Sequence, residues 1–392
     1  MVLDTETLPP ASAAWREGDP RGQRQFADVG ALRLELGGSL PLVRVAYETY
    51  GRLNPDGSNA VLVLHALTGD SHLSGPAGQG HPTPGWWEPL LSAGGPLDPA
   101  EWFVVAPNVL GGCQGTTGPT SSAPDGRPWG SRFPRITVRD QVVVERRLTA
   151  ALGVDAWAAV IGGSMGGMRS LEWAITYPDA LRAALVVAVG AAASADQIGT
   201  QTAQIAAITA DPKWRGGDYH DAAAGDGPYV GMGVARRFAH LTYRTEVELD
   251  VRFGTRAQDG EDPLTEGRFA VQSYLDHHAD KLARRFDAGT YVALTDAMST
   301  HDVGRGRGGV STALASIRVP VVIGGIDSDR LYPLRMQEEL AKLIPTAEQL
   351  DVITSPYGHD GFLLEMAAVS ALVKRTLTRS EKADRNSNRL AG

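Results

Sequence analysis

The sequence has little of what secreted, membrane-spanning or nucleic-acid-binding proteins require. Its 392 residues include one cysteine, Cys113, which excludes an internal disulfide. No run of about 18 apolar residues occurs that would span a membrane, and the first 30 residues lack the apolar segment of a signal peptide. The formal net charge of −8 argues against a general nucleic-acid surface. We therefore expect a cytoplasmic protein.

What the chain does contain is the composition of a globular protein, with 43% hydrophobic and 21% charged residues. Apolar runs without alternation at 59–69, 102–112 and 181–194 are typical of strands buried on both faces. Helical spacing at 136–154 separates the second run from the third. Strands that alternate with helices predict a mostly parallel sheet with right-handed crossovers.

The segment 32–51, LRLELGGSLPLVRVAYETYG, differs from these buried runs. Apolar and polar positions alternate in it on both sides of a glycine pair. This pattern is typical of an antiparallel hairpin. We predict that the hairpin forms one edge of the sheet.

A change of pattern in the second half of the chain predicts an insertion. Residues 195–309 contain helical segments and no strand of the earlier type, whereas IRVPVVIGGIDSDRLYP at 317–333 resumes the strand pattern. We predict a core of residues 30–194 and 310–378, interrupted by a helical lid at 195–309. The polar residues 379–392 are expected to form a flexible tail.

A serine stands among glycines at the junction of an apolar strand and a helix, in VIGGSMGGMRSLEWAITYP at 160–178. Glycine costs about 1 kcal/mol in a helix interior and weakens strands, so the cluster needs a geometric reason. A sharp, strained strand-to-helix turn supplies one, namely the G-x-S-x-G nucleophile elbow of the α/β-hydrolase fold, with Ser164 at its apex. The motif alone leaves a plain glycine-rich turn or a phosphate-binding loop open.

A nucleophilic serine needs a base, and the base needs an acid that fixes its tautomer. In this fold the chain order is Ser, then Asp or Glu, then His. Asp327 follows the apolar run VPVVIGG and is the predicted acid, with Asp329 as the second choice. His359, in SPYGHDGF, follows the last predicted strand and is the only histidine after His301. We predict that His359 is the base.

Acyl transfer also requires backbone donors for the oxyanion. The predicted donors are the amides of Met165, directly after the nucleophile, and of Leu67, in the loop HALTGDSH. His65 and His72 flank this loop, but neither an H-E-x-x-H motif nor paired cysteines support a metal site, and we predict none. Cys113 lacks an elbow and ordered partners, so we expect it to be a packing residue.

Five segments carry a more specific signal than the elbow: LHALTGDSH, NVLGGCQGTTGP, VIGGSMGGMRSLEWAITYP, GVARRFAHLTYRTE and SPYGHDGFLLE. Together they resemble the homoserine O-acetyltransferase family of methionine biosynthesis, from about residue 30 to 375. Lipases and esterases share the elbow, but we would not expect them to share the GCQGTTGP stretch or an aspartate directly after the histidine.

The resemblance implies a ping-pong reaction with acetyl-CoA as cosubstrate and no permanently bound cofactor. Ser164 would take the acetyl group, and the hydroxyl of L-homoserine would then accept it, with His359 as base in both steps. The resemblance further implies that Arg236 binds the substrate carboxylate and that Asp360 binds the ammonium, which suits their charges. A solvated helix face is the alternative for Arg236. A homodimer built through the helical lid is also expected.

Other activities remain compatible with the motifs. Succinyl-CoA as donor or serine as acceptor would change binding by about 1–3 kcal/mol, which motifs do not resolve. In a hydrolase of the same fold, water would deacylate Ser164. A non-catalytic binding scaffold is disfavoured, because it has no need for a nucleophile, a base, an acid and an oxyanion loop together.

Overall fold

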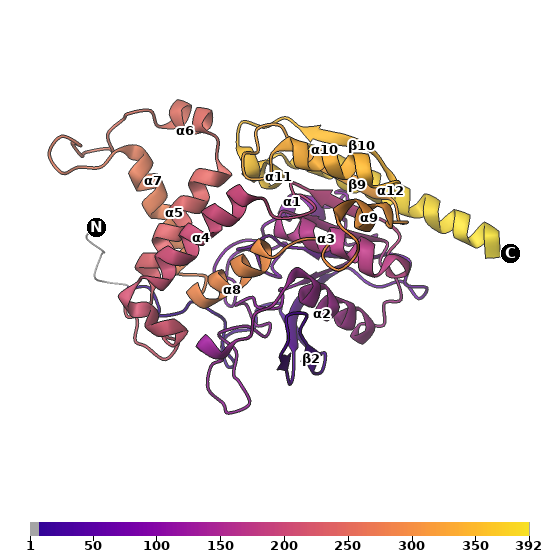
Figure 1. The fold of residues 1–392 in the computed structure, drawn as a ribbon, viewed down its shortest axis with the longest axis horizontal. Coiled ribbons are helices and arrows are strands. Elements are labelled where there is room, and N and C mark those ends of the chain that lie inside the picture. The colour runs from indigo at the N-terminus through magenta and orange to yellow at the C-terminus, as the bar shows by residue number, and fades with distance from the viewer. Residues whose placement is uncertain (1–7, 392) are drawn as a thin grey trace.

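An eight-stranded sheet forms the centre of the computed structural model, which describes residues 8–391 (Figure 1). The strand order is β1-β4-β6-β5-β7-β8-β9-β10. The six strands from β6 to β10 in this order are parallel to one another, as predicted, whereas β4 pairs antiparallel with β1 and β6. The strands are β1 (Gln25–Asp28), β4 (Arg44–Tyr50), β5 (Ala60–Leu64), β6 (Phe103–Pro107), β7 (Ala159–Gly163), β8 (Ala184–Val187), β9 (Val321–Ile326) and β10 (Ala347–Ile353).

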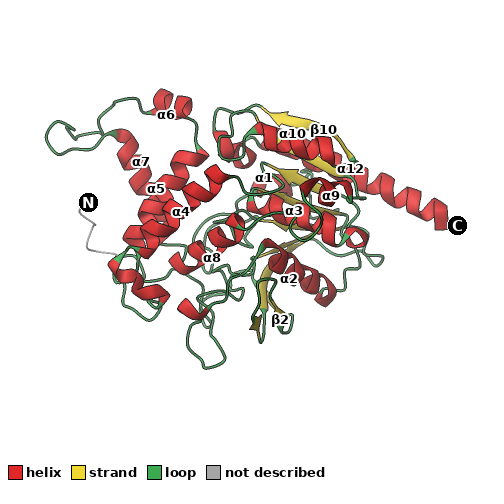
Figure 2. Cartoon of the chain, in the orientation of Figure 1, coloured by secondary structure: helices red, strands yellow, loops and turns green. Residues whose placement is uncertain are grey.

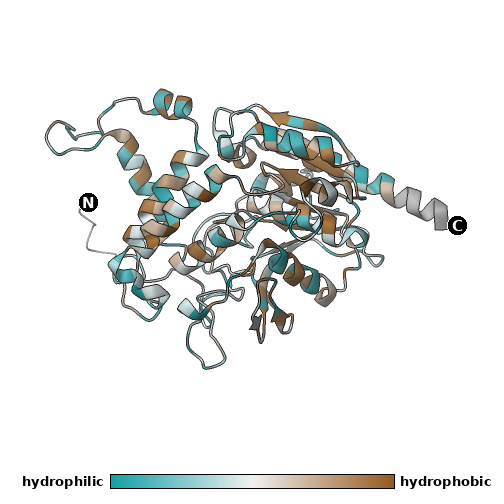
Figure 3. Ribbon diagram, viewed as in Figure 1, coloured by the Kyte–Doolittle hydropathy of each residue, from teal (hydrophilic) through white to brown (hydrophobic). Residues whose placement is uncertain are grey.

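Helices cover both faces of this sheet. Successive strand residues point to opposite sides, and both sides are apolar, so each face is buried under helices. Val160 belongs to the apolar cluster that includes residues of α2 (Val138–Ala151), α3 (Met165–Thr176) and α10 (Leu334–Leu343). The next residue, Ile161, belongs to the cluster with α1 (Glu88–Leu91) and α12 (Met366–Ala391). Figure 2 shows the helices around the strands, and Figure 3 shows apolar residues along the strands between them.

The predicted edge hairpin is only partly present. Its glycine pair does form a turn, in which Gly37 and Gly38 both have positive φ, but this turn joins β2 (Leu32–Arg33) and β3 (Ser39–Leu40) in a separate two-stranded sheet. The prediction that this hairpin forms the sheet edge is therefore wrong. Strand β4 has a central run of buried residues and lies between β1 and β6, so β1 is the edge strand on this side of the sheet.

Residues 195–309, all of them described, contain helices and no named strand. Helix α5 packs against α4 and α7, and α8 packs against α4. Figure 1 shows these helices beside the sheet rather than over it. The main helices of this lid are α4 (Ala195–Thr209), α5 (Tyr229–Tyr243), α6 (Glu246–Arg252), α7 (Ala270–Ala283) and α8 (Ala288–Ser299). A short helix, α9 (Val310–Ala315), follows the lid before β9.

The tail predicted from residue 379 is instead helical, because α12 continues without a break to Ala391. The sequence between 366 and 391 contains no proline or glycine, so polarity alone does not end the helix there. In Figure 1 the end of α12 extends past the sheet. None of the described helices is long and apolar enough to cross a bilayer.

Glycines allow α3 to approach the sheet closely. A Cβ added at Gly166 would overlap the carbonyl oxygen of Leu64 in β5, and one at Gly167 would lie 3.0 Å from the carbonyl oxygen of Val187 in β8. Both obstacles are main-chain atoms, which cannot rotate away as a flexible side chain would. The contact between α3 and the sheet therefore depends on missing side chains.

We expect Gly166→Ala to lower the free energy of unfolding by about 2–3 kcal/mol or more, because the added methyl group forces α3 away from β5. The matched control is Gly199→Ala in α4, where a Cβ meets nothing within 4 Å. That change should be neutral or stabilise the protein by up to about 1 kcal/mol. Urea unfolding of both variants measures the difference, and equal stabilities would contradict the close contact.

Candidate active site

Ser164 lies at the turn between β7 and α3, with φ 56° and ψ −125°. This is a left-handed conformation that residues with side chains rarely adopt. The neighbouring glycines make the turn possible, since a Cβ at Gly162 would overlap the main chain of Gly166. The turn has the geometry predicted for a nucleophile elbow.

A hydrogen-bonded chain connects Ser164 to a histidine and an aspartate from the end of the sequence. His359 Nε2 is 2.8 Å from Ser164 Oγ, and His359 Nδ1 is 2.7 Å from Asp329 Oδ2. The three residues are each at most 5% exposed. With Nδ1–H donating to the carboxylate, Nε2 is free to accept the serine proton. The arrangement is that of an activated serine nucleophile.

The predicted acid Asp327 is not part of this chain. Its Oδ1 accepts a hydrogen bond from the amide of Ser355 at 3.1 Å, and its own amide pairs with Ile353 O, so it continues the register between β9 and β10. The chain then turns, with the Asp329 amide donating to Ile326 O, and this turn directs Asp329 to the histidine. The assignment of Asp327 is therefore wrong, and the second choice, Asp329, takes its place.

The carboxylate of Asp329 is held from the other side as well. Its Oδ1 accepts hydrogen bonds from the amides of Leu331 and Tyr332 at 2.8 and 2.9 Å. This leaves Oδ2 for the histidine. An aspartate that accepts from amides two and three residues ahead is a local turn motif, and DSDRLYP contains that signal at Asp329.

Aromatic rings surround the imidazole of His359. The ring of Tyr332 lies 5.2 Å away and nearly parallel, and the rings of Phe362 and Tyr243 lie 5.4 and 5.8 Å away. These rings restrict the orientation of the imidazole and limit the access of water to it.

Of the two predicted oxyanion donors, one shares the pocket of the nucleophile and the other follows it directly in the chain. Leu67 lines the same pocket as Ser164, and Met165 is the first residue of α3. Among the described residues, neither amide donates a hydrogen bond to another group of the chain. Both amides are therefore available to an oxyanion.

The loop at 65–72 that carries Leu67 is fixed at both ends. His65 Nε2 accepts a hydrogen bond from the amide of Val109 at 3.0 Å, and burial, followed by the charge of Arg169, lowers the pKa of His65 to about 3. At the other end, Ser71 Oγ donates to the buried carboxylate of Glu48 at 2.9 Å. A fixed loop keeps an oxyanion donor in position.

Glu48, His72 and His81 form a buried cluster that resembles a metal site but has unsuitable geometry for one. The two imidazole rings are stacked 3.8 Å apart at 10°, so their in-plane lone pairs cannot converge on one ion. His81 Nε2 also accepts from the amide of Gln23 at 3.2 Å. Burial opposes a charge on His72, but the hydrogen bond and charge of Glu48 outweigh it and raise the pKa of His72. The cluster is best described as a hydrogen-bond network behind the loop.

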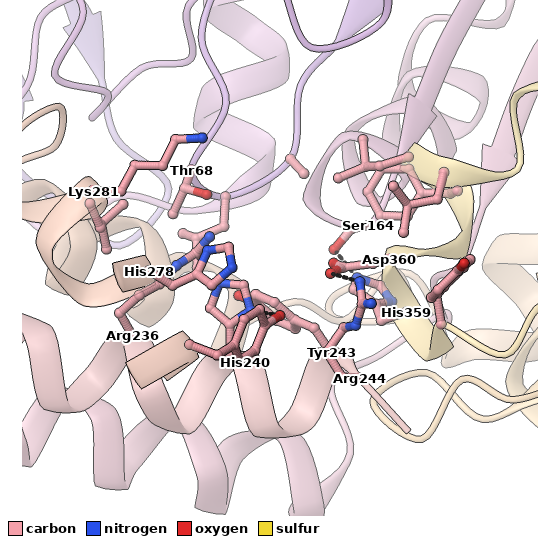
Figure 4. A pocket seen from close by; sticks show the side chains of 18 of the residues that line it. Thr68, Ser164, Arg236, His240, Tyr243, Arg244, His278, Lys281, His359 and Asp360 are labelled. Atoms are coloured by element: carbon pink, nitrogen blue, oxygen red, sulfur yellow. Dashed lines mark hydrogen bonds and ion pairs between the residues drawn. The ribbon is translucent and has the colours of Figure 1, made fainter. Parts of the chain in front are cut away.

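The nucleophile opens into a pocket of about 770 Å³ between the core and the lid. Figure 4 shows Ser164, His359 and Asp360 on one side of this pocket, with Arg244 of the lid beside them, and the lid residues Arg236, His240, His278 and Lys281 on the other side. Its walls carry one carboxylate, that of Asp360, against five cationic side chains, and the lid supplies all five: Arg236, Arg244, Arg252, Lys281 and Arg285. The pocket therefore favours anionic ligands.

The structure brings both predicted substrate-binding residues into this pocket. Arg236 lies with its guanidinium carbon 5.7 Å from the ring of Tyr243. Asp360 forms an ion pair with Arg244 at 3.4 Å, and Arg244 also pairs with Glu248 at 2.7 Å. Sequence reasoning missed Arg244, although it lies within the quoted segment GVARRFAHLTYRTE.

Cys113 lies elsewhere. It is 1% exposed, belongs to the apolar core and does not line the pocket. Burial raises the pKa of its thiol, which disfavours the nucleophilic thiolate.

Comparisons with known proteins place the chain in a family. Residues 59–365 match the family model described as alpha/beta hydrolase fold. A homoserine O-acetyltransferase of Thermobifida fusca is 61% identical over 380 residues, which cover 97% of this chain and 100% of that relative. The chain belongs to the homoserine O-acetyltransferase family. The predictions of the fold and of the family are both confirmed.

Solved structures agree with the fold of this homoserine O-acetyltransferase family member. A homoserine O-acetyltransferase from Bacillus anthracis has a TM-score of 0.81 and 24% identity, covering 90% of this chain and 97% of that chain. The esterase E22 has the same TM-score and identity, covering 90% and 99%. At this identity the likeness concerns the fold alone.

We expect Asp329→Asn to slow acylation of Ser164 by the activated ester 4-nitrophenyl acetate about 10³- to 10⁴-fold, because the amide no longer holds the imidazole in the required tautomer. Asp327→Asn is the matched control. Its amide keeps an oxygen for the Ser355 N–H, so its rate should stay within about tenfold of the original. The burst of 4-nitrophenol measures both rates, and a larger loss in Asp327→Asn would contradict the assignment.

Proposed function

We propose that this protein transfers the acetyl group of acetyl-CoA to the hydroxyl of L-homoserine and so serves methionine biosynthesis. The observation that carries the proposal is the chain Ser164–His359–Asp329 at the floor of a cationic pocket. The name of the Thermobifida fusca relative, at 61% identity, supports the choice of donor and acceptor. The cytoplasmic location remains a prediction.

In the first half-reaction, Ser164 Oγ attacks the thioester carbonyl while His359 Nε2 takes its proton. The amides of Leu67 and Met165 donate hydrogen bonds to the oxyanion. The carbon–sulfur bond then breaks, and CoA leaves as a thiol with the proton from His359. Asp329 stays ionised and stabilises the imidazolium throughout.

In the second half-reaction, the homoserine hydroxyl gives its proton to His359 Nε2 and attacks the ester of Ser164. The ester bond to Oγ breaks, and Ser164 recovers its proton from His359. The products are O-acetyl-L-homoserine and the free enzyme. Because His359 ends each half-reaction neutral, no net proton transfer to solvent is required.

Water would release acetate from the same intermediate, so the acceptor must be held in place. Positioning the hydroxyl beside His359 raises its effective concentration by orders of magnitude. We assign Arg236 to the carboxylate and Asp360 to the ammonium of the acceptor. Asp360 lines the pocket, and its ion pair with Arg244 at 3.4 Å is longer than the pair of Arg244 with Glu248 at 2.7 Å, so Glu248 is the closer partner of Arg244.

The excess of cations in the pocket suits a donor that carries phosphates, as CoA does. CoA enters and leaves in each cycle, so we expect no permanently bound cofactor. Succinyl-CoA as donor, serine as acceptor, and simple hydrolysis are the competing activities. Hydrolysis would use the same acyl-Ser164 intermediate and differs from transfer only in that water takes the place of the amino-acid hydroxyl.

We expect acetyl-CoA alone to add one acetyl group to the intact protein, and Ser164→Ala to abolish this addition, because the hydroxyl is the acceptor atom. Intact-protein mass spectrometry measures the label, with Cys113→Ala as a control that should still be labelled. In steady state, acetyl-CoA with homoserine should exceed succinyl-CoA, serine or water by about tenfold or more in kcat/KM. Acetyl on Cys113 with Ser164→Ala still active would overturn the mechanism.

The lid also carries a surface suited to a second copy of the chain. Helix α5 exposes an apolar stripe spaced by four, four and three residues: Val230, Val234, Phe238 and Leu241. Val247 and Val251 of α6 are 66% and 83% exposed. We assign this surface to a homodimer, because contiguous exposed apolar side chains mark protein interfaces and two-fold pairing covers the same patch on both copies.

We expect light scattering at micromolar concentration to give the mass of a dimer, and Phe238→Glu to give the mass of a monomer, since it places a charge in the apolar stripe. The matched control is Leu264→Glu, a 93% exposed residue between α6 and α7. That variant should remain dimeric. A monomeric unaltered protein would refute the dimer.

A further inference from the structure

Two side chains in the pocket have buried nitrogen atoms without a hydrogen-bond partner. They are Arg236, at Nε and Nη1, and His240, at Nε2. Among the described residues that line the pocket, only these two have such atoms. They stand four residues apart on α5 and so lie one above the other on the same helix face. Buried donors without a partner require an acceptor, and at the wall of a pocket a bound ligand or an ordered water supplies it.

Two other cations of the pocket, Arg244 and Arg285, have partners in the protein. Arg244 pairs with Glu248 and Asp360, and Arg285 donates to the carbonyl oxygen of Thr68 at 2.7 Å. Arg236 therefore differs from Arg244 and Arg285 in having buried donor atoms without a partner. His240 is its nearest neighbour along the helix face with the same property.

His240 is held in one orientation and is neutral. It is 4% exposed, its Nδ1 is 3.4 Å from the hydroxyl of Tyr274, and its ring lies 3.9 Å from the ring of His278. Burial, followed by the charges of Arg236, His278 and Arg244, lowers the pKa of His240 to about 2. With the hydroxyl of Tyr274 donating to Nδ1, the single ring hydrogen is on Nε2, which makes Nε2 a donor.

We propose that His240 is a further substrate-binding residue, and that its Nε2–H and the guanidinium of Arg236 together hold the carboxylate of the acceptor amino acid. This inference rests on the proposed acetyl transfer to homoserine. A carboxylate has two oxygens and accepts from both groups at once, with Arg236 supplying the charge and His240 a second, neutral donor. An ammonium group would be repelled at this position by Arg236.

The position suits the reaction. Tyr243 lies between the two ends of the site, with its ring 5.8 Å from that of His359 and 5.7 Å from the guanidinium carbon of Arg236. Figure 4 shows Arg236, His240 and His278 to one side of Tyr243 and Ser164 and His359 to the other. An acceptor held by its carboxylate beside His240 extends over Tyr243, with its hydroxyl directed to His359.

The test compares His240→Leu, which removes the donor, with His240→Gln, whose side-chain amide keeps an N–H near the same place. His277→Leu is the matched control, since His277 is an exposed histidine of α7 that does not line the pocket. Each variant is assayed with acetyl-CoA and either L-homoserine or 3-amino-1-propanol, which has the hydroxyl and the ammonium but no carboxylate. Thermal unfolding verifies that each variant is folded.

We expect His240→Leu to raise KM for homoserine about tenfold to a hundredfold, the change typical of losing a hydrogen bond to a charged group. His240→Gln should restore most of the affinity, and His277→Leu should match the original protein. With 3-amino-1-propanol, His240→Leu and the original protein should have the same KM, because the group that His240 binds is missing.

Three results would overturn the inference. An equal rise in KM with both acceptors would show that His240 acts on the shape of the pocket. A rise in KM for acetyl-CoA with normal homoserine dependence would assign His240 and Arg236 to a phosphate or carbonyl of CoA. A normal KM for homoserine in His240→Leu would remove His240 from the site while leaving acetyl transfer intact. Failure of the proposed function has a different signature, since the original protein itself would then not acetylate homoserine.

Discussion

The strained backbone of Ser164 persists because α3 is pressed against β5 and β7 without side chains between them. Gly162 and Gly166 meet main-chain atoms where any other residue would place a Cβ, so the turn cannot relax without moving the helix from the sheet. The turn holds Oγ 2.8 Å from His359 Nε2. It also makes Met165 the first residue of α3, where its amide has no acceptor within the helix. Nucleophile and oxyanion donor are thus fixed by a single packing contact, and the remaining parts of the site are arranged around it.

The core and the lid contribute different chemistry to the pocket. The loops at the carboxyl ends of the strands supply the groups that move protons, and the lid supplies the cations that recognise substrates. Arg285 links the two parts, because it belongs to the lid and donates to the carbonyl oxygen of Thr68, the residue after Leu67. A displacement of the lid therefore acts directly on the oxyanion loop. The cations of the lid and the loop of the oxyanion donor are therefore in direct contact at this point.

Much of the site could be predicted from the sequence, because the glycines around Ser164 and the chain order of Ser164 before His359 together match the elbow and base of an α/β-hydrolase. The choice between Asp327 and Asp329 could not be made from strand position, since both follow β9 and only the turn between them decides which carboxylate reaches the histidine. The role of His240 was not predicted from the sequence either. Its helical spacing from Arg236 was visible in the sequence, but the absence of a partner for its Nε2 is a property of the packed structure. The edge strand β1 was missed because its four residues, QFAD, carry no strong strand pattern.

The order of the active-site residues along the chain has a consequence for the protein while it is being synthesised. Ser164 and His359 are 195 residues apart, and the whole lid lies between the neighbouring strands β8 and β9. A nascent chain therefore carries the elbow serine long before its base is synthesised, and a serine without a base is a weak nucleophile. Closing so long an insertion adds little entropy cost beyond that of a shorter one, since the cost grows only with the logarithm of loop length. The unfinished protein therefore reacts little with cellular thioesters. Ser164 becomes a strong nucleophile only when the segment that carries His359 docks, which is also the step that completes folding.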